Sequence, residues 1–453
     1  MVPTRTIYHD DYILARFYGQ SANFTDIPNE LFSKYNVKKG LRNEDGTGVR
    51  IGLTRVSDVV GYDVDEKGNV VPCEGDLLFR GYSIMDLIKN RQGNFGFEET
   101  CFLLLFGFLP SEQQFKDFKN TISLRYDLPD KYLVNEILRS PSINLMNRLQ
   151  TLTLSLYNYD DDPDNLDVYE TVRKGLNIIA KFPALAVYAY QAKMHDTFHE
   201  SLIINYANRE LSIAENILRF LRPDGQFTER EANLLDAILL IHADHGGGNN
   251  STFTDVVIGS TGTDLYSAIC GSLGALKGPK HGGANISVAK MMVEVVDKIG
   301  YTTDKEKVRA VVNELFEGNM YDHTGLIYGF GHAVYTISDP RAEILRGLAK
   351  DLAIEKHCED RFEFYRLFED TVHEVMLERK GIVLPTNVDF YSGFAYELLG
   401  IPMDLYTPLF AIARVAGWVA HNVENKLYDG RIMRPATKYV GEHQDFVQMK
   451  DRR

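Results

Sequence analysis

The sequence has few cysteines and no long apolar run. Its four cysteines, Cys73, Cys101, Cys270 and Cys358, are scattered over 453 residues without a CxxC pair. This pattern is typical of buried thiols in a reducing compartment. The most apolar stretch, LLDAILLI, is too short to cross a membrane and contains Asp236. The sequence therefore predicts free thiols and no membrane span.

The start of the chain and its net charge argue against further classes of protein. Asp10 and Asp11 stand where a signal peptide would need an uninterrupted apolar core, so we expect a soluble, cytoplasmic protein. The net charge of −14 makes non-specific binding to nucleic acid or to an anionic membrane unfavourable. An anionic ligand would have to be met by cationic side chains gathered in one place.

The character of the sequence changes near residue 97. Up to about residue 80, Gly, Asp, Val and Thr are frequent and predict short strands, with a hairpin turn at Lys67-Gly68-Asn69. From FEETCFLLLFG onward, apolar residues recur every three to four positions, which predicts helices. Gly46-Thr47-Gly48 and the triple glycine at 246–248 lack the strand–turn–helix frame of a nucleotide-binding loop. We expect a mainly all-α protein of two domains with a small β element near the N-terminus.

Three histidines lie next to glycines or shortly before them, and glycines let backbone and ligand approach closely. His242 follows the predicted helix EREANLLDAILLI, and with His245 it precedes the triple glycine. No third metal ligand follows at a suitable spacing, so we predict no metal site. His242 is then either a hydrogen-bonded core residue or a polar group presented to a cleft. His332, in YGFGHAVY, is the second of the three.

The third histidine, His281, lies in LKGPKHGGAN just before a helix that we expect to start within 283–286. The partial positive charge at a helix N-terminus should lower the pKa of this imidazole and keep it neutral. A neutral imidazole can donate one hydrogen bond to an oxygen that gains negative charge. The alternative is a histidine that merely belongs to a turn.

Two arginines occupy unusual positions. Asp339 and Pro340 are the predicted N-cap and first residue of a helix, so Arg341 falls in its first turn, where a cation opposes the helix dipole. A carboxylate between Arg341 and the helix end would explain this placement; a surface arginine is the alternative. Arg414 lies within LFAIARVAGWVA, and a buried guanidinium needs an anionic partner. Phe410 precedes it by one turn on the same face.

One aspartate and a further arginine complete the set. Asp389, in LPTNVDFYSG, either caps the following helix or acts as a general base among apolar neighbours. Arg434 follows in the loop MRPATKYVG. Arginines clamp carboxylates, neutral histidines stabilise oxyanions and an aspartate removes a proton. This combination suits carbon–carbon bond formation on a dicarboxylate through an enol or enolate.

The motifs together resemble one family. IHADHGGGNNST, LKGPKHGGAN, YGFGHAVYTISDPR, LPTNVDFYSG and LFAIARVAG occur in the order and approximate spacing of the citrate/2-methylcitrate synthase family, and LLFRGY near the start is similar too. The resemblance covers essentially the whole chain. It implies a Si-type acyltransferase of the tricarboxylic acid cycle that condenses acetyl-CoA, oxaloacetate and water to citrate and CoA through citryl-CoA. It implies no cofactor, because acetyl-CoA is a substrate.

The resemblance also implies roles for individual residues. His281 would hydrogen-bond the thioester oxygen of acetyl-CoA while Asp389 removes a methyl proton. His332 would polarise the oxaloacetate carbonyl and supply a proton as the new bond forms. The residues that would bind oxaloacetate or line its pocket are His242, Arg341, Arg414, Phe410, Asn387 and, reaching across the interface of a homodimer, Arg434.

The implied architecture is a large helical domain of residues 1–281 and 395–453 and a small helical domain of residues 282–394. Closure of the two would exclude water, with hinge candidates among the glycines near 278–283, 329–331 and 393.

Two positions depart from the family pattern. Gly246 replaces a glutamate of many members, and Thr336 follows HAVY where some members carry a basic residue that meets the CoA phosphates. Contacts to those phosphates are expected elsewhere, with Lys277, Lys280 and Lys438 as weak candidates.

Two alternatives stay open. A 2-methylcitrate synthase would use propionyl-CoA in the same mechanism, and one extra methylene is discriminated by only about 1–3 kcal/mol. A non-catalytic sensor of CoA or dicarboxylates is the other alternative. It is disfavoured because His281, His332 and Asp389 are all present.

Overall fold

The computed structural model describes residues 15–16, 27–43, 47–91, 96–332, 334–382, 384–428 and 430–452. The predictions that rest on Asp10, Asp11 and Gly46 lie outside these ranges. The chain forms two compact units, one of Met1–Gly52 with Ile432–Arg453 and one of Leu53–Arg431.

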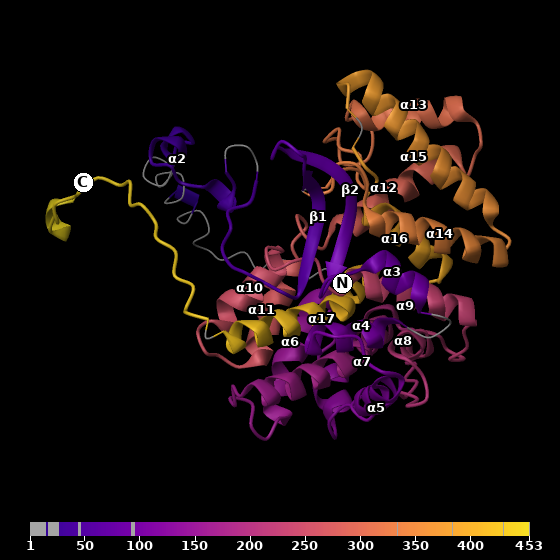
Figure 1. The fold of residues 1–453 in the computed structure, drawn as a ribbon, viewed down its shortest axis with the longest axis horizontal. Coiled ribbons are helices and arrows are strands. Elements are labelled where there is room, and N and C mark those ends of the chain that lie inside the picture. Colours follow the sequence, from indigo (N-terminus) through magenta and orange to yellow (C-terminus); the bar gives the residue numbers. More distant parts are fainter. Residues whose placement is uncertain are drawn as a thin grey trace. The chain divides into compact units, whose positions relative to one another are not determined.

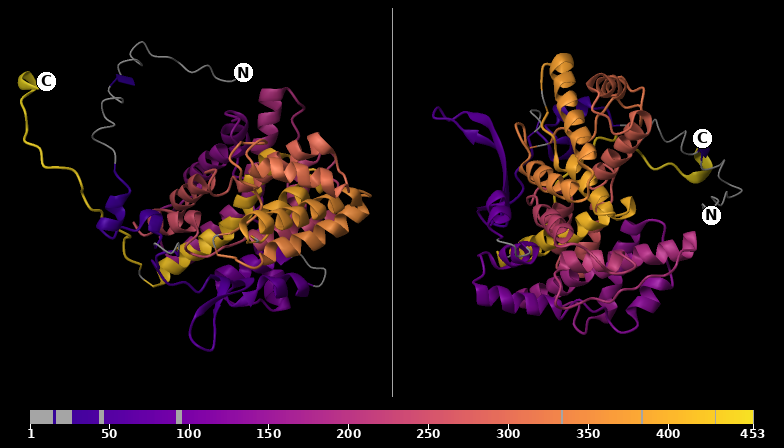
Figure 2. Two further views of the ribbon diagram at one scale, coloured as in Figure 1. Left: turned by 90° about the horizontal axis from the view of Figure 1, so that it is seen from above. Right: turned by 90° about the vertical axis from the view of Figure 1, so that its right-hand side faces the viewer.

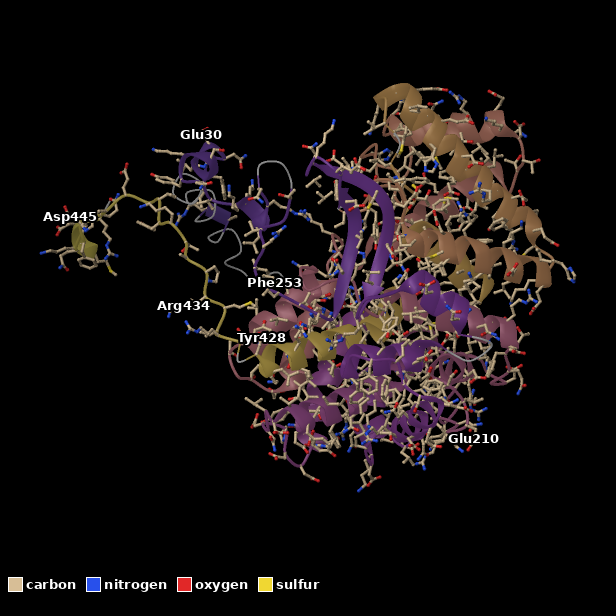
Figure 3. All side chains as sticks on the ribbon, in the orientation of Figure 1. Glu30, Glu210, Phe253, Tyr428, Arg434 and Asp445 are labelled. Atoms are coloured by element: carbon tan, nitrogen blue, oxygen red, sulfur yellow. The ribbon has the colours of Figure 1, made fainter. Side chains whose placement is uncertain are left out.

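The smaller unit has little regular structure among its described residues. Its elements have no buried residues and are helix α2 (Glu30–Lys34) and the 3-10 helices η1 (Lys39–Leu41) and η5 (Met449–Asp451). The segment before η5 is an extended chain, which Figure 3 shows with Arg434 and Asp445 labelled.

The larger unit begins with the expected β element. The antiparallel sheet has the order β1 (Ser57–Val64), β2 (Val70–Phe79) and β3 (Tyr82–Ser83). Between β1 and β2, the Asp65 carboxylate accepts hydrogen bonds from the N–H groups of Lys67 (2.9 Å) and Asn69 (2.8 Å), and Gly68 has a φ of +83°. The predicted hairpin turn is therefore confirmed.

All the remaining elements of the larger unit are helices, so the predicted mainly helical fold is confirmed (Figure 1). They are α3 (Ile84–Asn90), α4 (Gly96–Phe106), α5 (Glu112–Ser123), η2 (Leu133–Leu138), α6 (Leu145–Ser155), η3 (Leu156–Tyr159), α7 (Val168–Phe198), α8 (Ile213–Leu221), α9 (Glu229–His242), α10 (Asn250–Gly259), α11 (Leu265–Leu276), α12 (Ala284–Ile299), α13 (Lys305–Phe316), α14 (Pro340–Glu355), α15 (Glu359–Lys380), α16 (Val388–Leu398), η4 (Met403–Leu405) and α17 (Tyr406–Leu427).

Helix α17 is the central element of the larger unit. It packs against helices from both halves of the sequence, namely α4, α6, α7, α9, α10, α11 and α12. Its side chains are buried almost throughout, including Arg414 and Trp418. Among the described residues, none of the helices combines the length and apolar character that crossing a bilayer requires. All four cysteines are free thiols.

Helices α12 to α16 gather on one side of the larger unit (Figures 1 and 2). Within this group α12 packs on α16, α14 on α16 and α13 on α15, while α14 also contacts α9 and α12 contacts α17. The segment for which we expect a separate small domain, residues 282–394, lies within the larger unit, and the division into a large and a small domain stays a prediction. The independent movement of this segment stays a prediction too.

Helix α9 is anchored by a buried carboxylate in its middle. Asp236 accepts hydrogen bonds from the N–H groups of Gly96 (2.7 Å) and Phe97 (3.0 Å), which begin α4, and from Arg91 Nη1 (3.2 Å). A carboxylate at a helix N-terminus satisfies N–H groups that have no partner within the helix. Asp236 therefore joins α9 to α4 in the core.

Candidate active site

His242 is the last residue of α9 and is buried. Its Nδ1 lies 2.8 Å from the carbonyl oxygen of Ile238. A carbonyl can only accept, so Nδ1 carries the proton and Nε2 is left without a hydrogen-bond partner in a buried position. Burial, with a smaller effect of Arg341, lowers the pKa of His242 to about 3. One nitrogen of His242 is thus bonded in the core, as the first alternative expects, and the other is buried without a partner; its presentation to a ligand stays a prediction.

Arg414, in the middle of α17, is completely buried. Its Nε donates to the carbonyl oxygen of His242 (2.8 Å), and its guanidinium carbon lies 4.6 Å from the centroid of the Phe410 ring. Both Nη atoms are buried without a hydrogen-bond partner. Burial lowers the pKa of Arg414 to about 10, against the opposing charge of Asp244. Two unpaired N–H donors in a fixed fork match the geometry of a carboxylate.

Arg341 lies in the first turn of α14, as predicted, and is also buried, so the alternative of a surface arginine is wrong. Asp339 is the N-cap and accepts from the backbone N–H of Arg341 (3.0 Å). Its carboxylate also pairs with Arg341 Nε (3.0 Å) and Nη2 (2.8 Å). Burial alone would lower the pKa of Arg341, but Asp339 raises it above its usual range. The carboxylate expected between Arg341 and the helix end is therefore supplied by the protein itself.

Asp389 lies in the first turn of α16 and does not cap it. The N-cap is Asn387, whose Oδ1 accepts from the backbone N–H of Asp389 (3.1 Å) and whose Nδ2 donates to the carbonyl of Gly331 (2.9 Å). The capping alternative for Asp389 is thus wrong. Burial raises the pKa of the Asp389 carboxyl to about 6, although Arg341 acts to lower it. Such a carboxylate is ionised at neutral pH and basic enough to accept a proton.

His332 lies in the loop between α13 and α14. Its Nδ1 accepts hydrogen bonds from the N–H groups of Val334 and Tyr335, both at 3.1 Å. The proton of the neutral ring is therefore on Nε2. Burial, assisted by Arg341, lowers the pKa of His332 to about 4. The ring stacks on Tyr335 with centroids 4.6 Å apart, so it is a neutral and oriented hydrogen-bond donor.

His281 lies in the turn between α11 and α12, and α12 begins at Ala284, as predicted. Its Nε2 is 3.0 Å from Ser251 Oγ, which also accepts from Trp418 Nε1 (3.2 Å). The pKa of His281 is lowered to about 4, as expected, but the causes are burial and the charge of Arg414.

Sequence reasoning missed several residues that hold this site. Ser251 and Trp418 orient His281. Asp244 is fully buried and accepts from Ser57 Oγ, the N–H of Gly246 (3.0 Å) and His421 Nε2 (3.2 Å). Ser251 and Asp244 lie inside the quoted motif IHADHGGGNNST, yet their partners are far away in sequence, so the motif alone did not reveal their roles.

The predicted residues of the larger unit are linked by contacts and charge. Arg341 influences the pKa values of His242, His332 and Asp389, and Arg414 influences those of His242 and His281. The predicted pocket residues Phe410 and Asn387 contact members of the same set: the Phe410 ring lies 4.8 Å from that of His242, and Asn387 Oδ1 accepts from the N–H of Asp389 (3.1 Å).

Arg434 belongs to the smaller unit and is exposed there (Figure 3). Its role at a dimer interface stays a prediction. In the described part of the chain, no group of three or more His, Cys, Asp or Glu side chains is placed to hold a metal ion.

A family model described as "Citrate synthase, C-terminal domain" matches residues 45–436. The chain belongs to the citrate synthase family. This confirms the resemblance predicted from the motifs and, with it, an enzyme of the acyltransferase class.

Relatives in the citrate synthase family carry two names. The chain is 36% identical to the citrate synthase of Haloferax volcanii over 384 residues, which cover 83% of this chain and 93% of the relative. It is 33% identical to 2-methylcitrate synthase 1 of Corynebacterium glutamicum over 410 residues, which cover 89% and 98%.

Solved structures agree with the family assignment. The citrate synthase of Pyrobaculum aerophilum matches with a TM-score of 0.72 and 28% identity, covering 89% of this chain and 94% of that one. A ternary complex of the Thermoplasma acidophilum citrate synthase with carboxymethyl coenzyme A and oxaloacetate matches with a TM-score of 0.71 and 29% identity, covering 91% and 99%.

Proposed function

We propose that this chain condenses acetyl-CoA with oxaloacetate and water to form citrate and CoA, as a citrate synthase of the tricarboxylic acid cycle. The observation that carries the proposal is the buried guanidinium of Arg414, whose two Nη atoms have no partner, in a site that also holds a basic carboxylate at Asp389 and a neutral donor at His332. An unpaired buried cation is costly unless a ligand completes it, and an oxaloacetate carboxylate has the required charge and shape.

Oxaloacetate would bind between α9 and α17. One carboxylate would take the two Nη donors of Arg414, while the Phe410 ring under the guanidinium keeps the fork in place. Nε2 of His242 faces the same region without a partner. A bound carboxylate would favour the protonated imidazole, which can then donate from both nitrogens. Arg341 would contribute its remaining donors from the α14 side.

The ketone would be polarised by His332. Its Nε2–H points away from the backbone N–H groups that occupy Nδ1. As the new carbon–carbon bond forms, the ketone oxygen becomes an alkoxide and takes the Nε2 proton. The negative charge that develops on the ring is stabilised by the two N–H donors at Nδ1.

Acetyl-CoA would be activated by Asp389 and His281 together. The Asp389 carboxylate removes a methyl proton while His281 donates a hydrogen bond to the thioester oxygen, which requires the proton on Nδ1. Nε2 must then accept from the hydroxyl of Ser251, so the single proton of that hydroxyl, which is donated to Asn249 Oδ1 (2.9 Å), would have to turn toward His281 when the substrate binds. Water would hydrolyse the citryl-CoA intermediate to release citrate and CoA.

The assembly and location of the enzyme belong to the same proposal. We expect a cytoplasmic homodimer in which Arg434 reaches the partner's site, with no cofactor besides the substrates. Lys277 and Lys280 are exposed on the segment that carries His281 and are candidates for the CoA phosphates, as is Lys438 of the smaller unit. Closure of residues 282–394 would exclude water during the reaction.

The second candidate is a 2-methylcitrate synthase, which the Corynebacterium glutamicum relatives favour. The deciding experiment compares the release of CoA thiol from acetyl-CoA and from propionyl-CoA in the presence of oxaloacetate. A higher kcat/KM for acetyl-CoA is expected, and a higher value for propionyl-CoA would favour the second candidate. Binding of oxaloacetate without release of thiol from any short acyl-CoA would make the chain a sensor and refute both.

A further inference from the structure

The β1–β2 hairpin lies against the loop that follows His332. The Tyr335 hydroxyl donates to the carbonyl of Asp76 (3.4 Å), and the N–H of Gly75 donates to Ser338 Oγ (3.1 Å). Ser338 Oγ in turn donates to Glu74 of the same strand. The contacts run from just after His332 to just before Asp339, which caps α14.

The base of the hairpin contacts the segment that follows His242 at the end of α9. Ser57, the first residue of β1, donates to the Asp244 carboxylate and accepts from the N–H of Gly246 (3.1 Å). Asp244 follows His242 by two residues. The same short hairpin therefore touches the segment that carries His242 and the loop that carries His332.

Two glycines allow the hairpin to approach the loop this closely. Both lie in the irregular part of the ladder, between the pairs Val60↔Asp76 and Tyr62↔Pro72. A Cβ on Gly61 would collide with the carbonyl oxygen of Val334 and lie 3.0 Å from its carbonyl carbon and 3.3 Å from Tyr335 Cα. Irregular ladders of this kind redirect a strand locally, and here the redirected stretch meets the loop.

The second glycine meets the other end of the loop. A Cβ on Gly75 would collide with the carbonyl oxygen of Ser338, and it would lie 2.8 Å from Tyr335 Cδ1 and 3.1 Å from Pro340 Cδ. Neither Gly61 nor Gly75 has a positive φ, so alanine fits the backbone at both positions. The lack of space, and not the conformation, is what excludes a side chain.

The residues met by Gly61 are the ones that hold the His332 ring. The N–H groups of Val334 and Tyr335 are the two donors to Nδ1, and they place the ring proton on Nε2. We propose that the β1–β2 hairpin is a template that fixes the conformation of the His332 loop. Gly61 is then a positioning residue for the direction in which His332 donates its hydrogen bond. Gly75 is a positioning residue for the start of the helix that carries Arg341. This inference rests on the proposed function, in which His332 and Arg341 act on oxaloacetate.

The test is the variant Gly61→Ala, in the full-length protein. The added methyl group must displace the backbone at Val334, and a misplacement of about 1 Å costs about 100-fold in rate. We expect kcat to fall by about that factor, with a smaller change in the KM for acetyl-CoA. For Gly75→Ala we expect mainly a higher KM for oxaloacetate, since Arg341 follows Pro340.

The matched control is Gly68→Ala in the turn of the same hairpin. Gly68 has a φ of +83° and no atom within 4 Å of an added Cβ, so alanine strains the hairpin without touching the loop. A kcat near that of the wild type is expected. An equal loss of kcat in Gly68→Ala and Gly61→Ala would overturn the proposal, because it would show that only the stability of the hairpin matters.

A second measurement separates positioning from general damage. The infrared carbonyl band of bound oxaloacetate, labelled with carbon-13 at the ketone, reports the hydrogen bond that polarises it without any turnover. We expect the band to shift on binding to the wild type and to Gly68→Ala, and to return toward the free value in Gly61→Ala. An unchanged band in a folded Gly61→Ala would overturn the proposal.

If Gly61→Ala does not fold, Ser338→Ala decides the matter, because it removes only the hydroxyl that binds the N–H of Gly75 and the carboxylate of Glu74. A several-fold higher KM for oxaloacetate supports the template, and an unchanged KM overturns it. A wild-type protein that neither releases CoA thiol nor shifts the carbonyl band would refute the proposed function instead.

Discussion

The two buried arginines of the site differ in whether the protein supplies a carboxylate partner. Arg341, at the start of α14, has its own carboxylate partner in Asp339, which also accepts from the N–H of Val388 (3.1 Å) at the start of α16. Arg414, in α17, has two donors without a partner. The α14–α16 region is thus complete before any ligand binds, and the α9–α17 region is not. On the proposed function, the α14–α16 region would hold catalytic groups in place, and the α9–α17 region would be completed by an anionic substrate.

The largest expected effect concerns the completed region. Asp389→Ala removes the base at the start of α16, and general acid–base groups contribute about 100- to 10,000-fold in rate. Release of CoA thiol should fall by about 1,000-fold, whereas oxaloacetate binding measured by calorimetry should be almost unchanged. Turnover near that of the wild type would contradict the assignment of the base.

The second effect is on stability and separates the two arginines directly. Arg341→Ala leaves the buried Asp339 carboxylate without its partner, which costs about 3–5 kcal/mol of unfolding free energy. Arg414→Met removes a buried cation that feels the charge of Asp244 but has no hydrogen-bonded carboxylate, so the unliganded protein should lose much less stability than Arg341→Ala does. Denaturant unfolding without ligand measures the stability of both variants. Equal losses of unfolding free energy would contradict the view that Arg341 has a carboxylate partner in the protein and Arg414 lacks one.

The third effect concerns ligand affinity. Arg414→Ala removes the two free Nη donors, and hydrogen bonds to charged groups are worth about 1.5–3 kcal/mol each. We expect oxaloacetate to bind about 100-fold more weakly, with a smaller change in the KM for acetyl-CoA. Unchanged affinity would remove Arg414 from the binding site.

The fourth effect is the pH dependence of the rate. The pKa of Asp389 is raised to about 6, so the ionised base predominates at pH 7 and is lost as the pH falls through 6. We expect kcat to drop by about tenfold between pH 7 and pH 5. The stability contribution has the opposite sign: a raised carboxyl pKa favours the protonated folded form, so this contribution is lost as the pH rises through about 6. A pH profile that is flat over this range would contradict the assigned base.

The smallest effect is expected at Phe410. Its ring lies against the guanidinium of Arg414 and beside His242. Phe410→Leu keeps the bulk but loses the cation–π contact, which is worth about 0.5–2 kcal/mol. The KM for oxaloacetate should rise by a few-fold with kcat almost unchanged. A change in kcat larger than that in KM would show that the ring has another role.

The sequence predicted the features that depend on neighbouring residues. The turn at Lys67-Gly68-Asn69, the N-cap Asp339 with Pro340, and the start of α12 near His281 are all local, because backbone conformation is decided there by the side chains next to it. The family motifs also led to the set of residues that the larger unit brings together.

The partners across the fold could not be predicted in this way. Ser251 and Trp418 are 167 residues apart, and nothing near either one reveals the contact. The cause of the lowered pKa of His281 was also misjudged, because burial depends on packing that the local sequence does not show. Asp389 was a plausible cap by residue type, and only the backbone shows that Asn387 takes that role.

Helix α9 carries His242, a residue of the candidate active site, at its C-terminal end. Asp236 binds the helix to the first residues of α4, and His242 lies six residues further on, about 9 Å along the axis. The charge that makes LLDAILLI unsuited to a lipid bilayer is thus what fastens the middle of α9 to α4. On the proposed function, substitutions that break the bonds between Asp236 and the start of α4 would disturb the position of His242 and weaken the binding of oxaloacetate.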